Sequence, residues 1–265
     1  MKDALCASLS EGYPWKDRIF CFPTIGSTND HLRSLAQQGA PHGTVVLAKH
    51  QTNGHGRRGR FFHSPEGMGI YLSMLLRPGC KPTELMHLTC AVAVAVCDAV
   101  KSASGVQPGI KWTNDLVVGR KKLGGILTEL SLTPDGLVDY AIIGIGINCR
   151  QKKADFPAEI RDIACSLDMV TKKQVAAAAL AAAILENLQQ MAGSLLADRE
   201  TMLERYRADC ITLGQEISLV RGEEIRHGKA LSVDAEGALV VAFSDGTMEA
   251  VNSGEVSIRG MYGYV

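Results

Sequence analysis

Residues 109–149, "GIKWTNDLVVGRKKLGGILTELSLTPDGLVDYAIIGIGINC", restrict the fold of this chain more than any other stretch. They alternate apolar and β-branched segments with short turn signals at Gly119-Arg120 and Pro134-Asp135-Gly136. Turns this short join strands that lie side by side and run in opposite directions. We therefore expect an antiparallel meander of strands at the centre of the molecule.

The segments on either side of this meander mix strands with helices. Strands are predicted at 43–51 and 69–78, where apolar and β-branched residues run together. Helices are predicted at 26–38, 84–102, 172–191 and 198–210, with Ser27 or Thr28 as the N-cap of the first. The pattern predicts an α+β fold with helices packed on a sheet.

The texture of the sequence changes beyond Leu213. Short strands are predicted at 216–221, 224–233, 237–243 and 246–252, joined by the polar turns "RGE", "DAEG" and "SDGT". Closely spaced strands of this kind are typical of a small β-barrel of about 50 residues. We expect a first domain at 1–212 and a barrel domain at 213–265.

Composition narrows the class of protein further. The chain has 265 residues, 46% of them hydrophobic, and 28 basic side chains balance 28 acidic ones, so no overall basic field would gather DNA or an anionic membrane. The apolar runs at 90–97 and 175–185 are shorter than the roughly 20 residues of a membrane span. Eight cysteines without a C-x-x-C pair predict reduced, buried thiols and a cytoplasmic location.

The glycine- and arginine-rich stretch "HQTNGHGRRGRFFHSPEG", residues 50–67, indicates an anion-binding loop. Its glycines let the backbone N–H groups approach a ligand, and Arg57, Arg58 and Arg60 suit phosphate or carboxylate. "GHGRRG" matches the G-x-G-x-x-G pattern of dinucleotide-binding folds, but Pro65 and a strand follow it where a helix should begin. A P-loop is excluded because Gly-Lys-Ser/Thr is missing after these glycines.

Two other stretches carry polar groups suited to a nucleotide. In "KWTNDLVVGRKKLGGILTEL", residues 111–130, Asn114 and Asp115 offer oxygen ligands for Mg²⁺, although "ND" alone is also a simple turn signal. Lys121 and Lys122 suit either a solvated hairpin end or an anion, and the glycines that follow them leave room for a ligand. In "GIGIN", residues 144–148, small residues at a strand end leave space beside the Asn148 amide.

Taken together, the motifs resemble those of the biotin protein ligases. "STN", "Q-x-x-G-x-G-R-R-G-R", "KWTND", "RKKLGGIL-x-E" and "GIGIN" occur in that family's order between about residues 24 and 150, and "GEVSIR" at 254–259 resembles the end of its C-terminal barrel. The resemblance implies a mixed sheet with helices on one side, as in class II aminoacyl-tRNA synthetases, plus an SH3-like barrel. It implies that biotin and Mg-ATP form biotinyl-5′-AMP and pyrophosphate, and that biotin is then transferred to a lysine of a biotin carboxyl carrier protein.

The resemblance also assigns residues to the two substrates. Those implied to bind biotin are Ser27, Thr28, Asn29, Gln51, Gly54, His55, Gly56, Arg57, Lys122 and Gly124. Those implied to bind the nucleotide are Arg57, Arg58, Arg60, Trp112, Asn114, Asp115 and Asn148. The catalytic residues would be Arg57, Lys122 and Asp115, with Asp115 also as the Mg²⁺ ligand and as a hypothetical base for the acceptor lysine.

Two positions depart from the family pattern. His55 stands where arginine is usual, which predicts weaker or pH-dependent phosphate binding, and Thr113 replaces a proline, for which we expect little effect. The loop at 54–66 is predicted to be mobile until the adenylate orders it.

Other functions remain open at the level of sequence. Lipoate and octanoate ligases share the implied fold and the acyl-adenylate chemistry, and a non-catalytic biotin-binding protein is a further alternative. Only about twenty residues precede the motifs, so the resemblance is to the form without an N-terminal DNA-binding domain, and direct DNA binding is not expected. Neither a monomer nor a homodimer is favoured.

Overall fold

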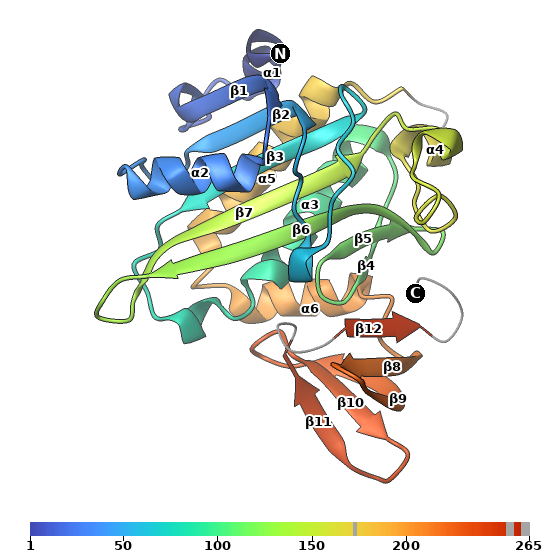
Figure 1. Cartoon of the computed structure of the whole chain (residues 1–265). Coiled ribbons are helices and arrows are strands. Elements are labelled where there is room, and N and C mark those ends of the chain that lie inside the picture. Colours follow the sequence, from blue (N-terminus) through green and yellow to red (C-terminus); the bar gives the residue numbers. More distant parts are fainter. Residues whose placement is uncertain (172–173, 253–256, 261–265) are drawn as a thin grey trace.

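The computed structural model describes residues 1–171, 174–252 and 257–260, and it contains two sheets (Figure 1). The helices are α1 (Lys2–Ser8), α2 (Thr28–Gln37), α3 (Leu88–Ser104), α4 (Leu167–Val170), α5 (Ala177–Ser194) and α6 (Arg199–Asp209). The strands of the larger sheet are β1 (Ile19–Ile25), β2 (Val45–Gln51), β3 (Gly69–Leu76), β4 (Gly109–Lys111), β5 (Asp115–Val118), β6 (Lys121–Leu132) and β7 (Val138–Asn148). The strands of the smaller sheet are β8 (Glu216–Arg221), β9 (Glu224–Val233), β10 (Leu239–Phe243), β11 (Met248–Val251) and β12 (Ser257–Gly260).

The larger sheet is mixed and has the strand order β1-β2-β3-β7-β6-β5-β4. β1 pairs with β2 in parallel, whereas the other neighbours pair antiparallel. β4 to β7 follow one another in the sheet, which confirms the predicted meander. Gly119 and Arg120 both have positive φ (55° and 65°), as the tight turn between two antiparallel strands requires.

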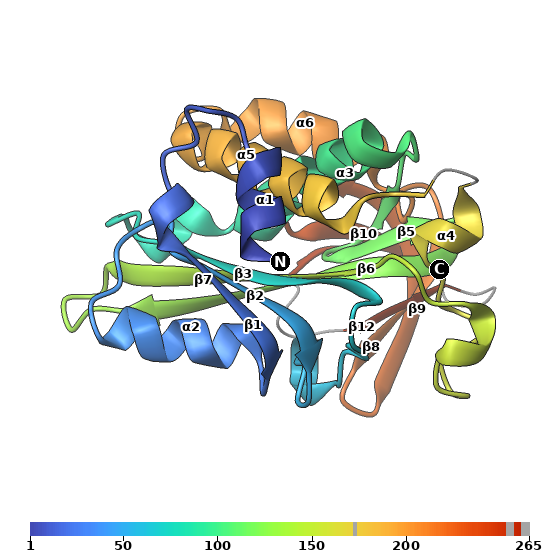
Figure 2. The same ribbon diagram turned by 90° about the horizontal axis from the view of Figure 1, so that it is seen from above.

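Helices cover both faces of this sheet, so the expectation that they lie on one side is wrong. Figure 2 shows α3, α5 and α6 on one side and α2 on the other. α3 and α5 lie over the main apolar core, to which Val45 and Met74 belong. α2 packs Leu32 against the next residues along these strands, Val46 and Leu75, which point to the opposite face.

The helices differ from their predicted ranges chiefly at their ends. α2 begins after Ser27, whose hydroxyl accepts a hydrogen bond from the Asp30 N–H as a helix cap should. α3 ends at Gly105, which has a φ of 76°. α5 begins at Ala177, and residues 172–173 of the predicted helix lie outside the described residues.

One stretch, Pro82–Ser104, is by length and composition alone apolar enough to cross a membrane. Within the fold, however, 72% of the most apolar 18-residue segment of this stretch is buried. α3 therefore has the character of a core helix, against which α5 and α6 pack.

The smaller sheet follows α6 and has the order β11-β10-β9-β8-β12 among the described residues. β8 and β9 coincide with the predicted strands, whereas β10 and β11 begin two residues later than predicted. Residues 253–256 and 261–265 of the predicted barrel, with part of "GEVSIR", lie outside the described residues. The predicted fold class, a mixed sheet with packed helices and a small C-terminal β-structure, is confirmed.

The cysteines are free thiols, as the sequence predicts. Cys90, Cys97, Cys149 and Cys165 are buried. Burial raises the pKa of Cys149 to about 12 and that of Cys165 to about 11, because a thiolate is poorly solvated inside a protein.

Candidate active site

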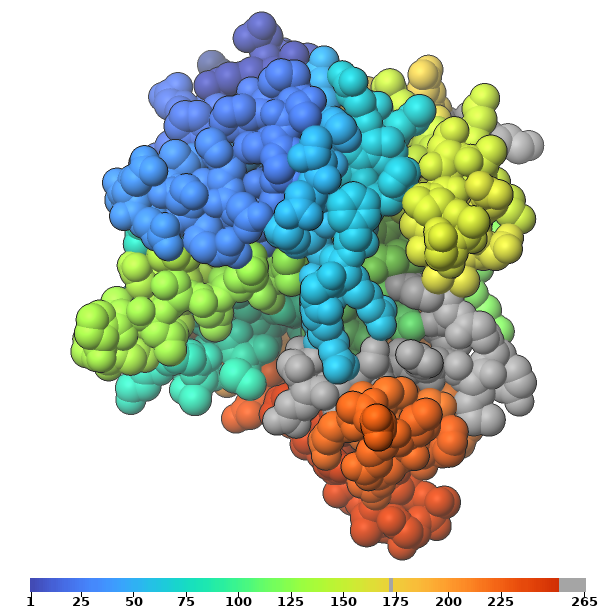
Figure 3. All heavy atoms as spheres, in the orientation of Figure 1, coloured from blue at the N-terminus to red at the C-terminus, as the bar shows by residue number. Residues whose placement is uncertain are grey.

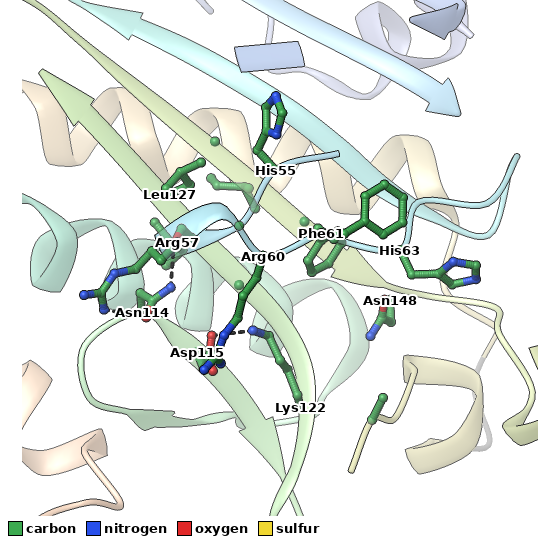
Figure 4. Close-up of a pocket in the computed structure, with 18 of the residues that line it drawn as sticks. His55, Arg57, Arg60, Phe61, His63, Asn114, Asp115, Lys122, Leu127 and Asn148 are labelled. Atoms are coloured by element: carbon green, nitrogen blue, oxygen red, sulfur yellow. Dashed lines mark hydrogen bonds and ion pairs between the residues drawn. The ribbon is translucent and has the colours of Figure 1, made fainter. Parts of the chain in front are cut away.

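A cavity of about 260 Å³ opens on the same face of the large sheet as α2, beside the N-terminus of that helix. Most of the predicted site residues line it (Figure 4). They are Ser27, Thr28, Asn29, Gln51, His55, Gly56, Arg57, Arg58, Arg60, Trp112, Asn114, Asp115, Lys122 and Asn148. Segments far apart in the sequence are therefore brought together as predicted.

Among the predicted residues, Gly54 and Gly124 do not line this cavity. They allow close backbone packing behind it: a Cβ on Gly54 would lie 2.6 Å from the Phe62 carbonyl oxygen, and one on Gly124 would lie 2.4 Å from the Gly146 carbonyl oxygen. Both contacts are too short for any side chain, so these positions shape the wall without touching the cavity.

The glycine–arginine loop forms a small hairpin that leaves β2 and crosses the cavity. The Gly56 N–H donates to the Arg60 carbonyl at 2.7 Å, and the Phe62 N–H donates to the Gly54 carbonyl at 2.9 Å. Its tip is a 3-10 turn at Arg57–Gly59 in which Arg58 takes a left-handed φ of 58°. Figure 3 shows this loop, in pale blue, running down the face of the molecule beside the yellow segment near residue 160.

Arg57 points from the loop tip to the turn between β4 and β5. Its Nη1 donates to Asn114 Oδ1 at 3.1 Å (Figure 4). Burial lowers the pKa of Arg57 and nearby Asp115 opposes this effect, but an arginine stays charged in either case. The Asn114 amide is fixed in turn, because its Nδ2 donates to the Ile126 carbonyl at 2.8 Å.

A partly buried ion pair lies next to Arg57. The Lys122 ammonium on β6 donates to Asp115 Oδ1 on β5 at 2.6 Å. The register of this hairpin places Asp115 opposite Gly125, where a Cβ would be 3.3 Å from Lys122 Nζ, so the glycine gives the lysine room to cross. Two cations and one anion thus converge at this end of the cavity.

Hydroxyl and amide groups also line the cavity. Gln51 Oε1 accepts from the Thr28 N–H at 2.8 Å and from Thr28 Oγ1 at 3.0 Å. Gln51 Nε2 donates to Ser64 Oγ at 3.0 Å, which fixes the orientation of the Gln51 amide. Phe62 fills the space above Gly146, where a Cβ would come within 2.4 Å of its ring.

His55, the departure from the family pattern, pairs with α2. Its Nε2 lies 2.7 Å from Asp30 Oδ2 and links the loop to the first turn of that helix. Partial burial of Asp30 opposes ionisation, but hydrogen bonds from Arg33 and His55 outweigh it and lower the pKa of Asp30.

Sequence reasoning missed one wall of the cavity, the segment from Gln151 to Ser166. It pairs with the backbone of Lys122: the Lys122 N–H donates to the Ile163 carbonyl at 2.8 Å, and the Cys165 N–H donates to the Lys122 carbonyl at 2.9 Å. Its residues on the cavity are Phe156, Ile160, Ile163 and Ala164. The occurrence of these apolar residues in an otherwise polar stretch was the sequence signal that could have identified this wall.

Asn148 holds this segment in place. Its Nδ2 donates to the Cys165 carbonyl at 3.0 Å, and its Oδ1 accepts from Gln151 Nε2 at 3.1 Å. Lys111 on β4 was also missed as a lining residue, although it is part of the quoted motif "KWTND". It is a buried lysine, exposed by only 8%.

Trp112 forms part of the cavity wall, as expected, and connects it to the smaller sheet. Its indole Nε1 donates to the Gly237 carbonyl at 3.0 Å, and its backbone N–H donates to Thr212 Oγ1 at 2.9 Å. The Trp112–Thr113 peptide bond is cis, and the Tyr206 hydroxyl donates to the Thr113 carbonyl at 3.1 Å.

Comparison with known proteins places this arrangement in a family. The sequence model of the biotin/lipoate A/B protein ligase family matches residues 21–148, and that of the biotin protein ligase C-terminal domain matches residues 212–259. The chain is 36% identical over 223 residues to the bifunctional ligase/repressor BirA of Bacillus spizizenii, covering 84% of this chain and 68% of that protein.

Two further relatives span nearly the whole chain. The biotin–[acetyl-CoA-carboxylase] ligase of Mycobacterium tuberculosis is 30% identical over 255 residues, covering 94% of this chain and 91% of that one. The structure of biotin protein ligase from Aquifex aeolicus in complex with biotin and ATP matches with a TM-score of 0.78 at 28% identity, covering 91% and 98% of the two chains. On the sequence motifs, the fold and these matches, the chain belongs to the biotin protein ligase family.

Proposed function

We propose that this chain activates biotin with ATP, giving biotinyl-5′-AMP and pyrophosphate, and then transfers biotin to a lysine of a biotin carboxyl carrier protein. The observation that carries the proposal is the cavity, because Arg57 and Lys122 line it together with the hydrogen-bonded side chains of Thr28 and Gln51. The similar protein from Aquifex aeolicus binds biotin and ATP together. One cavity thus suits a ligand with an anionic end and a polar, uncharged end.

The first step brings two anions into contact. A carboxylate oxygen of biotin attacks the α-phosphorus of ATP, the bond to the bridging oxygen of pyrophosphate breaks, and pyrophosphate leaves with its electron pair. Fixed cations lower the repulsion between the reactants and stabilise charge on the transferring group. Arg57 and Lys122 are the cations that we assign to this task.

The loop arginines and the surrounding residues complete the proposed nucleotide site. Arg58 and Arg60 line the cavity from the loop and would contact phosphates, while Trp112 would shield the ligand from water. Asn114 and Asn148 have amides that are held by the protein itself, so we assign them to shaping the nucleotide site.

The residues fit a Mg²⁺ ion that arrives with ATP better than one held by the protein alone. Among the described residues, no group of three His, Cys, Asp or Glu side chains is placed to hold a metal. Asp115 would supply one carboxylate, and phosphates and water would complete the coordination, as is usual for Mg²⁺. The ion would neutralise phosphate charge.

In the second step, the amine of the carrier lysine attacks the acyl carbon of biotinyl-5′-AMP and AMP leaves. The attacking amine must lose a proton, because a lysine has a reference pKa of about 10.4. Asp115 is the one carboxylate among the described residues that line the cavity, and it remains the hypothetical base.

The division of the chain at residue 212 and its cytoplasmic location remain predictions. The C-terminal family match begins at residue 212 and β8 begins at Glu216, and both support the proposed boundary. Absence of direct DNA binding is predicted from the balanced charge. The oligomeric state is open to a direct mass measurement in solution.

Pyrophosphate release from Mg-ATP tests the choice of acid. Biotin, lipoate and octanoate would be supplied separately, with a biotin carboxyl carrier domain added in a second stage. We expect release with biotin alone and labelling of the carrier lysine, since the C-terminal match is to biotin ligases. Release with lipoate or octanoate instead would move the chain to a sister activity, and no release with any acid would favour a binding protein.

A further inference from the structure

A chain of hydrogen bonds runs from Glu129 on β6 to Thr28 in the cavity. Asn29 Nδ2 donates to Glu129 Oε2 at 2.6 Å, and Ser73 Oγ on β3 lies 2.5 Å from Asn29 Oδ1. The same Ser73 oxygen lies 2.8 Å from Thr28 Oγ1. Thr28, Asn29 and Ser73 are all buried. A partly exposed carboxylate is therefore connected to a cavity hydroxyl through two buried side chains.

The charge of Glu129 decides which way the Asn29 amide faces. An ionised carboxylate only accepts hydrogen bonds, so the Asn29 NH₂ must point to it and Oδ1 must point to Ser73. Arg33 holds the carboxylate in place through a 2.7 Å ion pair with Glu129 Oε1. Gly144 leaves the space for the amide, because a Cβ there would lie 2.2 Å from Asn29 Oδ1.

This orientation sets the positions of the hydroxyl protons. Ser73 has one proton, and it must go to Asn29 Oδ1, which has none. The single Thr28 proton is then directed inward and shared between Ser73 Oγ at 2.8 Å and Gln51 Oε1 at 3.0 Å, as a three-centre hydrogen bond. With its proton directed inward, Thr28 Oγ1 has only a lone pair to offer to a ligand. Thr28 lines the cavity, so this lone pair can accept a hydrogen bond there.

Donors arranged head to tail toward an anion strengthen one another. When a side chain donates a hydrogen bond toward Glu129, the oxygen of that same side chain becomes more negative and accepts the next hydrogen bond more strongly. The final oxygen in the series is Thr28 Oγ1. The low polarity around these buried groups limits the screening of this effect. Thr28 is therefore a stronger acceptor than an isolated hydroxyl.

We propose that Glu129 is a positioning residue for ligand recognition, which acts through Asn29 and Ser73 to present Thr28 Oγ1 as an acceptor for a ligand N–H. The inference rests on the proposed function, since biotin carries a urea with two N–H donors. The dithiolane ring of lipoate and the alkyl chain of octanoate carry none. Glu129 would thus contribute to the choice of biotin over these acids.

Glu129→Gln tests the proposal, because it keeps the shape of the side chain and removes the anion. Dissociation constants for biotin, desthiobiotin, lipoate and ATP would be measured by calorimetry on the full chain. We expect the two urea-containing ligands to bind about three- to tenfold more weakly, the effect of one misdirected hydrogen bond. Affinities for ATP and for lipoate should not change.

Asp139→Asn is the matched control. Asp139 on β7 forms a 2.6 Å ion pair with Arg77, comparable in length to that between Glu129 and Arg33, and it lies outside the cavity lining. This variant should bind biotin as the unmodified chain does. Equal weakening of all four ligands in Glu129→Gln would indicate a general structural role and would overturn the proposal.

A double-mutant cycle with Ser73→Ala tests the relay itself. Ser73→Ala leaves the Glu129–Arg33 ion pair in place. It therefore also provides a test of the relay if Glu129→Gln does not fold. It should weaken biotin and desthiobiotin selectively, and adding Glu129→Gln should then change their affinities by less than about twofold. If the effects of the two substitutions on biotin affinity are additive, or if Glu129→Gln leaves biotin affinity unchanged, the relay is refuted while the proposed function stands. A wild-type chain that binds lipoate but no biotin would overturn the proposed function as well.

Discussion

At the residue scale, Asp115 and Lys122 connect the geometry of the cavity to its chemistry. Their 2.6 Å ion pair neutralises both charges until anionic substrates compete for the lysine. The pair also fixes the direction of the Lys122 ammonium, which Figure 4 shows facing Asp115 beneath the loop arginines. Asp115 therefore has a part in positioning Lys122, besides its proposed roles toward Mg²⁺ and the acceptor lysine.

Asp115→Asn is expected to lower both half-reactions by about tenfold or more, because loss of a charge-assisted hydrogen bond leaves Lys122 misdirected. Pyrophosphate release would report adenylation, and single-turnover transfer from preformed biotinyl-5′-AMP would report the second step. Asp162→Asn, which removes a surface ion pair with Lys153, should affect neither. Intact adenylation with transfer lost would instead identify Asp115 as the base for the acceptor lysine.

Asp30 gives a prediction about pH. Its pKa is lowered in the folded chain, so its ionisation stabilises the fold above the unfolded value of about 3.9, and this contribution is lost as the pH falls through the lowered pKa. Asp30→Asn should therefore be less stable than the wild type at neutral pH, and the difference should shrink below about pH 4. Urea unfolding across this range is the measurement; a difference that grows in acid would contradict the assignment.

At the element scale, the glycine–arginine loop is a small hairpin closed by its own backbone hydrogen bonds. The His55–Asp30 and Arg57–Asn114 contacts connect it to α2 and to the β4–β5 turn. We expect limited proteolysis between residues 54 and 66 to slow when biotin and Mg-ATP are both present, since the adenylate adds phosphate contacts to the arginines. Equal cleavage rates with and without the substrates would count against closure.

β7 has no room for a side chain at Gly144, where the Asn29 side chain of α2 packs against it. Gly144→Ala should cost about 1–3 kcal/mol of stability, because its Cβ would overlap the Asn29 amide. It should also weaken biotin binding, since displacing Asn29 breaks the path to Thr28. Gly193→Ala, on α5, is the control and should retain biotin affinity, because only its chain neighbours and the backbone of its own helix lie within 4 Å of the added carbon. A fully stable, tightly binding Gly144→Ala chain would refute this account of the strand.

The elements that local patterns predicted well are those with regular periodicity or a clear cap. Ser27 marks the start of α2, and the polar turns separate β8 and β9 within the chain. β1 was not predicted, because Pro23 interrupts its apolar run, and such a strand is tolerated at the edge of a sheet. The segment from Gln151 to Ser166 was missed because it is ordered by long-range backbone bonds to Lys122, which leave no periodic signal.

At the scale of the whole molecule, the large sheet provides a rigid support for a site assembled from distant segments. The motifs identified the cations and the Thr28–Gln51 cluster, because each occurs in a short stretch with a distinctive composition. The sequence alone could not reveal the hydrogen bond between Glu129 on β6 and Asn29 on α2, since that contact depends on the register of β6, β7 and β3. Trp112 adds a connection to the smaller sheet through Gly237.

The most direct test of the account is the fate of biotin and Mg-ATP on the wild-type chain when no carrier protein is present. The account predicts one equivalent of pyrophosphate per chain and biotinyl-5′-AMP retained in the cavity, detected by mass analysis. In Lys122→Gln, formation of the adenylate should be slower by a factor on the order of a hundred. Absence of biotin-dependent pyrophosphate from the wild type, or an unchanged rate in Lys122→Gln, would contradict the central claim that this cavity joins the two substrates.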